Sequence, residues 1–210
     1  MTALILINPH AAGGRAQQLI SHVQAWCHAL PPQNDSPQIV VPDSIEKALE
    51  LLSQLPPKTR VVLIGGDGTL NQMLPGLMQG NFQVGLVPYG SGNDCARAWG
   101  LHRLSWLQAL AHALHARSSS IDVGRIELDN KVIRYFHSSL AVGFDASVGN
   151  RALAGPQFLR GLPRYLLATL RELAYLKNWY LKVEVDGLLM YEGPTLLASV
   201  LNTPTYGGGM

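Results

Sequence analysis

The chain has 210 residues, of which 47% are hydrophobic and 14% charged, and its formal net charge is +2. This length suits one large or two small domains, and so small a charge gives no electrostatic footprint for binding nucleic acid. Two cysteines cannot form a disulfide framework and favour a reducing, cytoplasmic location. No apolar run reaches the roughly 18 residues of a spanning helix. The first residues lack a signal peptide's basic start, so any membrane contact is expected to be peripheral.

Strands and helices are expected to alternate over the first 120 residues. The short apolar runs are typical of strands buried on both faces of a parallel sheet. The expected strands span residues 3–8, 38–41, 61–64 and 83–87. The expected helices span residues 15–30, 44–55, 69 onward, 93–99 and 102–117, and the second of them is capped by Asp43 or Ser44. This alternation predicts a doubly wound α/β sheet with right-handed crossovers.

The helix expected after residue 69 carries two local signals. Thr69 with Gln72 three residues later matches a capping box, which predicts that Thr69 is the N-cap. Pro75 and Gly76 lie inside the expected helix, and they predict that it is short or kinked.

The pattern changes after Ser118-Ser119-Ser120, where we place a domain boundary near residue 121. Residues 1–121 form the α/β domain and residues 122–210 a β-rich antiparallel one. Asp129-Asn130 and Asp186-Gly187 are expected to be hairpin turns. The expected elements of this half are strands at residues 121–128, 131–142, 181–185, 188–191 and 195–201, with a helix at residues 163–177.

Glycine-rich stretches follow three of the expected parallel strands, at residues 8–14, 65–69 and 90–94. In an open α/β sheet the carboxyl ends of the strands meet at one edge, where ligands bind. Glycines let backbone N–H groups approach an anion, and a helix N-terminus adds partial positive charge. The three stretches therefore predict a polyphosphate site.

Asp67 stands among these expected phosphate-binding amides. A carboxylate there repels phosphate unless a cation intervenes, so Asp67 predicts Mg²⁺. The alternative is that residues 65–69 form only a tight strand-to-helix turn. Ser91 offers a hydroxyl, Asn93 either reads a nucleotide or caps the next helix, and Asp94 is also a candidate cap.

Three motifs together resemble the diacylglycerol kinase catalytic domain: NPHAAGGRA (8–16), GGDGTLN (65–71) and PYGSGND (88–94). The segments IDVG (121–124), VGFDA (142–146), LPRYLL (162–167) and NTPTYGGGM (202–210) resemble the same family, so the resemblance covers the whole chain. It implies an α/β nucleotide-binding domain with a GGDGT loop, followed by an antiparallel β-sandwich domain with one helix, which is incomplete here.

The resemblance also implies ATP-dependent, Mg²⁺-assisted phosphorylation of a hydroxyl of diacylglycerol or a similar lipid, as in phospholipid metabolism. Asp67, Asp94 and Asp122 match the acidic positions of the family's active site, with Asp67 as the metal ligand. The expected nucleotide contacts are Asn8, Pro9, His10, Ala11, Ala12, Gly65, Gly66, Asp67, Gly68, Thr69, Leu70, Asn71, Ser91, Gly92 and Asn93.

Two departures from the family's sequence pattern leave other functions open. Ala11-Ala12 replace the family's Ser-Gly, and the family's general base follows a loop like residues 207–209, after which this sequence stops. One alternative is a non-catalytic nucleotide- or lipid-binding module, and another is a GGDGT kinase of a soluble substrate such as NAD. The unfinished sandwich should leave open strand edges, which predicts self-association into a homo-oligomer. The basic residues of helix 163–177 suit an anionic membrane surface, although an ordinary amphipathic helix is the alternative.

Overall fold

The computed structural model describes residues 3–30, 36–155 and 162–207 of the chain. Contacts divide it into two compact units, one formed by residues 1–138 with 202–210 and the other by residues 139–201. In chain order, the second unit is thus inserted into the first. The boundary near residue 121 stays a prediction.

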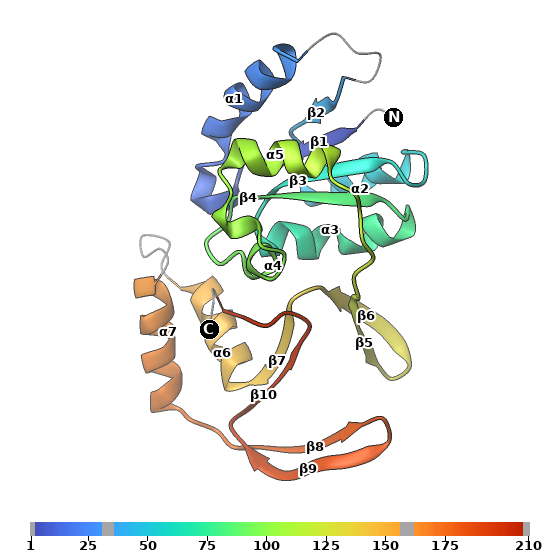
Figure 1. Cartoon of the computed structure of the whole chain (residues 1–210). Helices are drawn as coiled ribbons and strands as arrows, with labels where there is room; N and C mark the ends of the chain where they lie inside the picture. Colours follow the sequence, from blue (N-terminus) through green and yellow to red (C-terminus); the bar gives the residue numbers. More distant parts are fainter. Residues whose placement is uncertain (1–2, 31–35, 156–161, 208–210) are drawn as a thin grey trace. The chain divides into compact units, whose positions relative to one another are not determined.

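The first unit contains a four-stranded parallel sheet (Figure 1). Its order is β2-β1-β3-β4, and β1 pairs with both β2 and β3. The strands are β1 (Leu4–Ile7), β2 (Gln38–Val40), β3 (Arg60–Gly65) and β4 (Gln83–Pro88). All four residues of β1 are buried, as its unbroken apolar sequence predicts.

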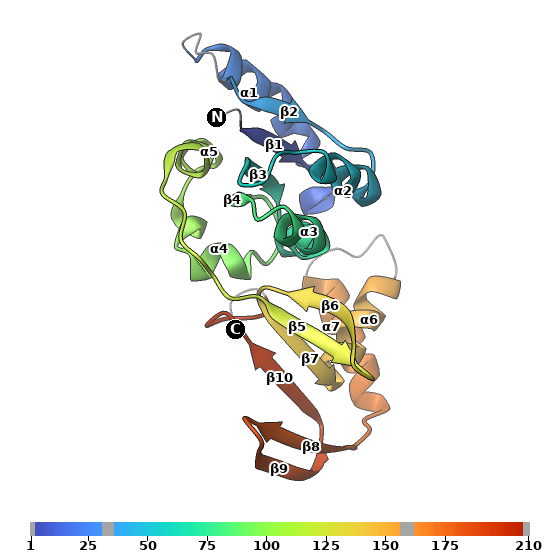
Figure 2. The same ribbon diagram turned by 90° about the vertical axis from the view of Figure 1, so that its right-hand side faces the viewer.

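Helices cover both faces of this sheet (Figure 2). On one face Leu6 and Leu63 pack with α2 and α3, and on the other Ile5 and Val62 pack with α1 and α5. The helices are α1 (Gln17–His28), α2 (Ile45–Ser53), α3 (Asp67–Gln79), α4 (Asp94–Ala98) and α5 (Trp106–His115), with 3-10 turns η1 (Ala11–Gly14) and η2 (Leu101–Arg103). The predicted doubly wound α/β architecture is confirmed.

Two helix starts differ from those predicted. Gly66, not Thr69, is the N-cap of α3, and α3 runs 13 residues through Pro75 instead of stopping short. The single helix expected at residues 102–117 is divided into η2 and α5. It divides because Ser105 forms a capping box with Gln108 and so begins a new helix at Trp106.

The hairpin of β5 (Gly124–Leu128) and β6 (Lys131–Phe136) turns at Asp129 and Asn130, which both adopt positive φ as a two-residue turn requires. The strand expected to run from 131 to 142 breaks after Phe136, and β7 (Ser139–Gly143) pairs instead with β10 (Leu197–Leu201) in the second unit.

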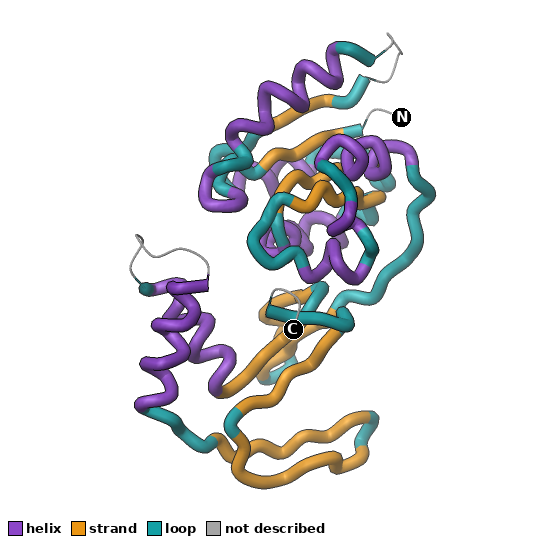
Figure 3. Tube along the Cα trace, turned by 60° about the vertical axis from the view of Figure 1, so that its left-hand side comes forward, coloured by secondary structure: helices purple, strands orange, loops and turns teal. Residues whose placement is uncertain are grey.

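The second unit combines antiparallel strands with two helices (Figure 3). Helix α6 (Phe144–Ala154) was not predicted; Val148 and Ala152 pack against Ala168 of α7 (Leu162–Ala174). Strands β8 (Trp179–Val185) and β9 (Leu188–Thr195) form the predicted hairpin. None of the helices in the described part of the chain has the length and apolar character that crossing a membrane requires.

Candidate active site

The carboxyl ends of β1 and β3 are tied together by side chains. Asn8 Nδ2 donates a hydrogen bond to Thr69 Oγ1 at 2.8 Å, and Asn8 Oδ1 accepts one from the backbone N–H of His10 at 3.0 Å. The N–H of Tyr89, just after β4, donates to the Gly65 carbonyl at 2.8 Å. The structure thus brings the three predicted loops to one edge of the sheet.

Glycines allow two of these loops to touch. A Cβ on Gly66 would lie 2.8 Å from Gly90 Cα, so side chains at this contact would force the β3 and β4 loops apart. By contrast, a Cβ on Gly68 would meet nothing within 4 Å. The N-cap of α3 is Gly66, which has no side chain to bond the first N–H groups of the helix. These N–H groups therefore suit an anion.

The first loop is a strained 3-10 turn. Ala12 has φ 53° and ψ 34°, which is the left-handed conformation that glycine adopts most easily. Its carbonyl accepts a hydrogen bond from Arg15 Nε at 3.1 Å. The alanine at this position therefore keeps a backbone shape suited to glycine, at a conformational cost of about 1 kcal/mol.

Asp67 links α3 to α4 through its carboxylate. Oδ2 accepts the backbone N–H of Asp94 at 2.9 Å, and Oδ1 accepts that of Cys95 at 3.0 Å. The helix cap assigned to Asp94 or Asn93 as alternatives is thus supplied by Asp67. Asp94 is instead the first residue of α4 and is buried, and Thr205 Oγ1 donates to its Oδ1 at 3.4 Å.

Asn93 combines an unusual backbone with an unused acceptor. It has φ 55°, and its Nδ2 donates to the Gly90 carbonyl at 2.9 Å. Its Oδ1 is buried and has no hydrogen-bond partner among the described residues. Because an orphaned buried oxygen is costly, this atom suits a ligand's donor group.

The other predicted contacts lie in different surroundings. Leu70 packs in the core, so it can offer a ligand only its backbone, whereas Ser91 is exposed. Asp122 is exposed and lines a cleft of about 1020 Å³. The cleft is also lined by Leu70, Leu74 and His137. Asn202 Nδ2 donates to the backbone carbonyls of both Asp122 and His137, at 2.8 and 3.0 Å.

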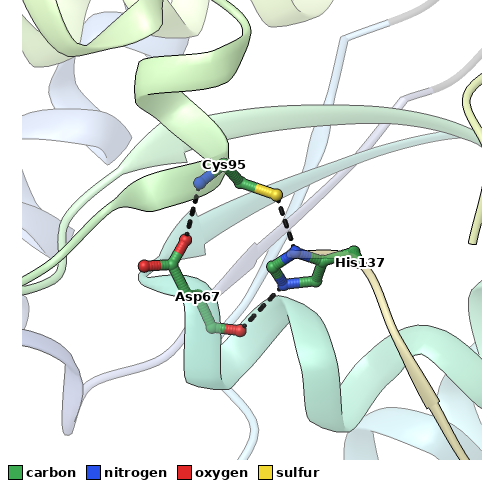
Figure 4. Close-up of side chains that lie close together, drawn as sticks. All are labelled: Asp67, Cys95 and His137. Atoms are coloured by element: carbon green, nitrogen blue, oxygen red, sulfur yellow. Dashed lines mark hydrogen bonds between the residues drawn. The ribbon is translucent and has the colours of Figure 1, made fainter. Parts of the chain in front are cut away.

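A side-chain cluster that the sequence did not predict adjoins this edge (Figure 4). Cys95 Sγ lies 2.7 Å from His137 Nδ1, and His137 Nε2 lies 3.2 Å from the Asp67 carbonyl oxygen. A carbonyl only accepts, so Nε2 carries the proton and Nδ1 accepts from the Cys95 thiol. Burial and the nearby carboxylates of Asp67 and Asp94 raise the pKa of Cys95 to about 12, whereas burial lowers the pKa of His137. Thiol and imidazole are therefore both neutral.

Comparison with known proteins identifies the family. The sequence model of the diacylglycerol kinase catalytic domain matches residues 2–126. The chain belongs to this family. A second model, the YegS C-terminal NAD kinase beta sandwich-like domain, matches residues 138–210 and confirms the sandwich-like class predicted for the second half. The family resemblance read from the three glycine motifs is therefore correct.

Two similar proteins are both called diacylglycerol kinase. The one from Mycobacterium tuberculosis is 34% identical over 150 residues, which cover 71% of this chain and 48% of that protein. The one from Bacillus subtilis is 27% identical over 150 residues, 70% and 48% of the two chains. A solved diacylglycerol kinase structure from Bacillus anthracis str. Sterne matches with a TM-score of 0.62 at 21% identity, covering 99% of this chain and 66% of that one, which supports the fold. The chain spans about half the length of these curated relatives.

Proposed function

We propose that the chain carries the nucleotide site of an ATP-dependent lipid kinase, which transfers the γ-phosphate to a hydroxyl of diacylglycerol or a similar lipid. The observation that carries this proposal is the glycine contact between Gly66 and Gly90, beside the open N-terminus of α3. Membership of a lipid kinase family supports the same reaction class. A cytoplasmic location with peripheral membrane contact is part of the proposal.

The residues of this edge fit a polyphosphate. The amides at the start of α3 would hold phosphate oxygens, and the open space at Gly68 would leave room for a bound phosphate. Asn93 Oδ1 would accept a donor from the nucleotide. Because phosphoryl transfer depends mainly on positioning and charge neutralisation, these fixed donors would supply much of what the reaction needs.

Asp67 is the proposed Mg²⁺ ligand. Each of its carboxylate oxygens already accepts one backbone N–H, and each retains a further lone pair that a cation can use. The two hydrogen bonds would hold the carboxylate in a fixed orientation. Mg²⁺ bound there would neutralise charge on the phosphates. Within the described residues, Asp67, Asp94 and Asp122 do not form a three-carboxylate cluster, so one carboxylate with phosphate and water is the ligand set that fits.

Asp122 is the better candidate for the base that accepts the hydroxyl proton. It is exposed and lines the cleft, where an incoming lipid hydroxyl can reach it. Asp94 is buried at the start of α4 and accepts from Thr205. A general base must come within hydrogen-bond reach of the proton it removes, which favours Asp122.

Transfer of γ-labelled phosphate from ATP to diacylglycerol in mixed micelles with Mg²⁺ tests the proposal. We expect label in the lipid phase, and its loss in Asp122→Asn. Label in a water-soluble product would instead favour a kinase of a soluble substrate. ATP binding without any transfer would favour a non-catalytic binding module, which the alanine at the strained Ala12 position also favours.

A further inference from the structure

Asp67, Cys95 and His137 bring three metal-binding atom types together in the first unit. One potential ligand atom from each residue lies within 4.8 Å of the other two. They come from α3, α4 and the segment after β6, so the fold itself gathers them. Cys95 and His137 are buried and Asp67 is half-buried. The Mg²⁺ and nucleotide roles proposed above make no use of the thiol or the imidazole.

Hydrogen bonds around the cluster already hold two ligands as a metal site would. Nε2 of His137 donates to the Asp67 carbonyl, which directs the Nδ1 lone pair toward Cys95. Metal-binding histidines commonly use their second ring nitrogen in this way, and ligating carboxylates are commonly hydrogen-bonded as well. The Asp67 carboxylate receives two backbone N–H groups, from Asp94 and Cys95.

The ligand types select the metal. Thiolate and imidazole suit Zn²⁺, whereas Mg²⁺ prefers oxygen ligands alone. Tetrahedral Zn²⁺ holds sulfur and nitrogen ligands roughly 3.5 Å apart, compared with 2.7 Å between Cys95 Sγ and His137 Nδ1 here. The two atoms therefore need to separate by about 1 Å when the ion binds.

We propose that Asp67, Cys95 and His137 form a binding site for Zn²⁺, with water in the fourth position. His137 lines the 1020 Å³ cleft, which gives the ion a path from solvent. On binding, the ion replaces the thiol proton, which leaves to solvent, and bonds to the resulting thiolate, to neutral Nδ1 and to the carboxylate.

Zn²⁺ at this site would act against the proposed kinase reaction. It would engage the carboxylate that we propose for Mg²⁺, so bound Zn²⁺ would inhibit transfer. Only this consequence rests on the proposed function. Binding itself needs neither nucleotide nor lipid, so a metal titration of the chain alone separates failure of the site from failure of the kinase assignment.

Titration of the metal-free 210-residue chain with Co²⁺ tests the site, because a cobalt–thiolate bond absorbs in the near ultraviolet. We expect one Co²⁺ per chain, displaced by an equivalent of Zn²⁺. Cys95→Ser should abolish the thiolate absorption. His137→Gln, which can still donate to the Asp67 carbonyl, should weaken Co²⁺ binding about tenfold or more.

Cys27→Ser is the matched control, since Cys27 is the chain's other free cysteine and lies in α1. This variant should bind Co²⁺ as the unmodified chain does. Circular dichroism of each variant reports whether it folds, and His137→Gln keeps the test open should Cys95→Ser not fold. The proposal is overturned by no thiolate absorption in the unmodified chain, by absorption that persists in Cys95→Ser, or by unchanged affinity in His137→Gln.

Discussion

At the scale of single residues, the Asp67 carboxylate connects helices α3 and α4. It accepts the first two N–H groups of α4 while belonging to the first turn of α3. In an asparagine the side-chain NH₂ would face one of these donors, so one bond is lost and a buried N–H is left without an acceptor. We expect Asp67→Asn to cost about 2–4 kcal/mol of unfolding free energy and to reduce phosphate transfer at least about a hundredfold.

Thermal unfolding and the micelle transfer assay measure these two effects. Asp43→Asn is the control, because Asp43 is exposed and its ion pair with Lys47 lies on the surface. That variant should match the unmodified chain in both assays. Full activity in Asp67→Asn would contradict the proposed role of Asp67 as a metal ligand.

The Cys95 thiol should make stability depend on alkaline pH. Its pKa is about 12 when folded, compared with 9.0 for an unperturbed cysteine. The folded state therefore retains the proton longer than the unfolded state does. This stabilisation is complete below pH 9 and is lost as pH rises toward 12.

Denaturant unfolding of the unmodified chain and of Cys95→Ala checks this between pH 7 and pH 10.5. The difference in unfolding free energy between the two should be constant up to pH 9. At pH 10.5 the unmodified chain should have lost about 2 kcal/mol of unfolding free energy relative to Cys95→Ala. A difference that does not vary with pH would mean that the thiol titrates normally in the folded chain.

At the element scale, Gly66 and Gly68 offer a matched pair of substitutions in one loop. Gly66→Ala places a methyl group 2.8 Å from the Gly90 backbone, whereas a methyl group at Gly68 has open space beyond its own helix turn among the described residues. We expect Gly66→Ala to lower the unfolding temperature strongly. Gly68→Ala should unfold at or above the original temperature, because alanine is the better helix former.

ATP binding should distinguish the packing role of Gly66 from the phosphate-binding role proposed for the loop at Gly68. In Gly68→Ala we expect at least about a tenfold weaker affinity by calorimetry, since the new methyl group would take up space that we propose for the phosphate. ATP binding that is unchanged in this stable variant would contradict a phosphate site at the start of α3.

The capping box at Ser105 allows a second prediction at the scale of the element. Ser105→Ala removes the acceptor for the Gln108 N–H at the start of α5. We expect a loss of about 1 kcal/mol, or roughly 2–4 °C in unfolding temperature for a chain of this size. Ser119→Ala, in the exposed segment after α5, should leave the unfolding temperature where it was.

The elements that the sequence predicted well are those whose own residues determine them. The apolar run of β3 and the Asp129-Asn130 turn need no distant partner to be recognised. Helix α6 was missed because Gly149 interrupts any apolar stripe, and its helical form depends on packing with Ala168. Thr69 was wrongly assigned as a cap because its hydroxyl accepts from Asn8, 61 residues away.

The candidate site was likewise predictable where local sequence determines it, and not where it depends on distant contacts. Glycine stretches after strands predicted where the loops meet, because the carboxyl ends of parallel strands share one edge. Nothing in the sequence pointed to the contact between Cys95 and His137. They are 42 residues apart, and a lone histidine near the end of a strand carries no spacing signal. The capping role of Asp67 likewise depends on how β3 and β4 are placed side by side.

At the scale of the whole molecule, the second unit exposes many apolar side chains. On β9, Leu188 and Met190 are 68% and 66% exposed, and on α7 Leu170 is 65% exposed. The β8–β9 hairpin is paired with no further strand among the described residues, and an isolated hairpin is marginally stable in water. We therefore expect the 210-residue chain to self-associate at micromolar concentrations.

Sedimentation velocity at several concentrations measures this association. The double variant Leu188→Glu with Met190→Glu should shift the chain toward monomer, because charges oppose pairing of an exposed strand. Lys131→Glu, on the exposed β5–β6 hairpin of the other unit, controls for added negative charge. A monodisperse monomer of the unmodified chain would contradict the prediction.

The insertion of residues 139–201 between the two stretches of the first unit has a consequence for synthesis. The N–H of Asn202 bonds the Ser138 carbonyl at 2.7 Å, and Thr205 reaches Asp94. A ribosome must translate the whole inserted unit before these residues exist, which takes on the order of several seconds. Until then, the nascent sheet and its glycine loops lack the segment after residue 201, which supplies hydrogen-bond partners for Asp94 and His137. Completion of the first unit therefore waits on translation of the second.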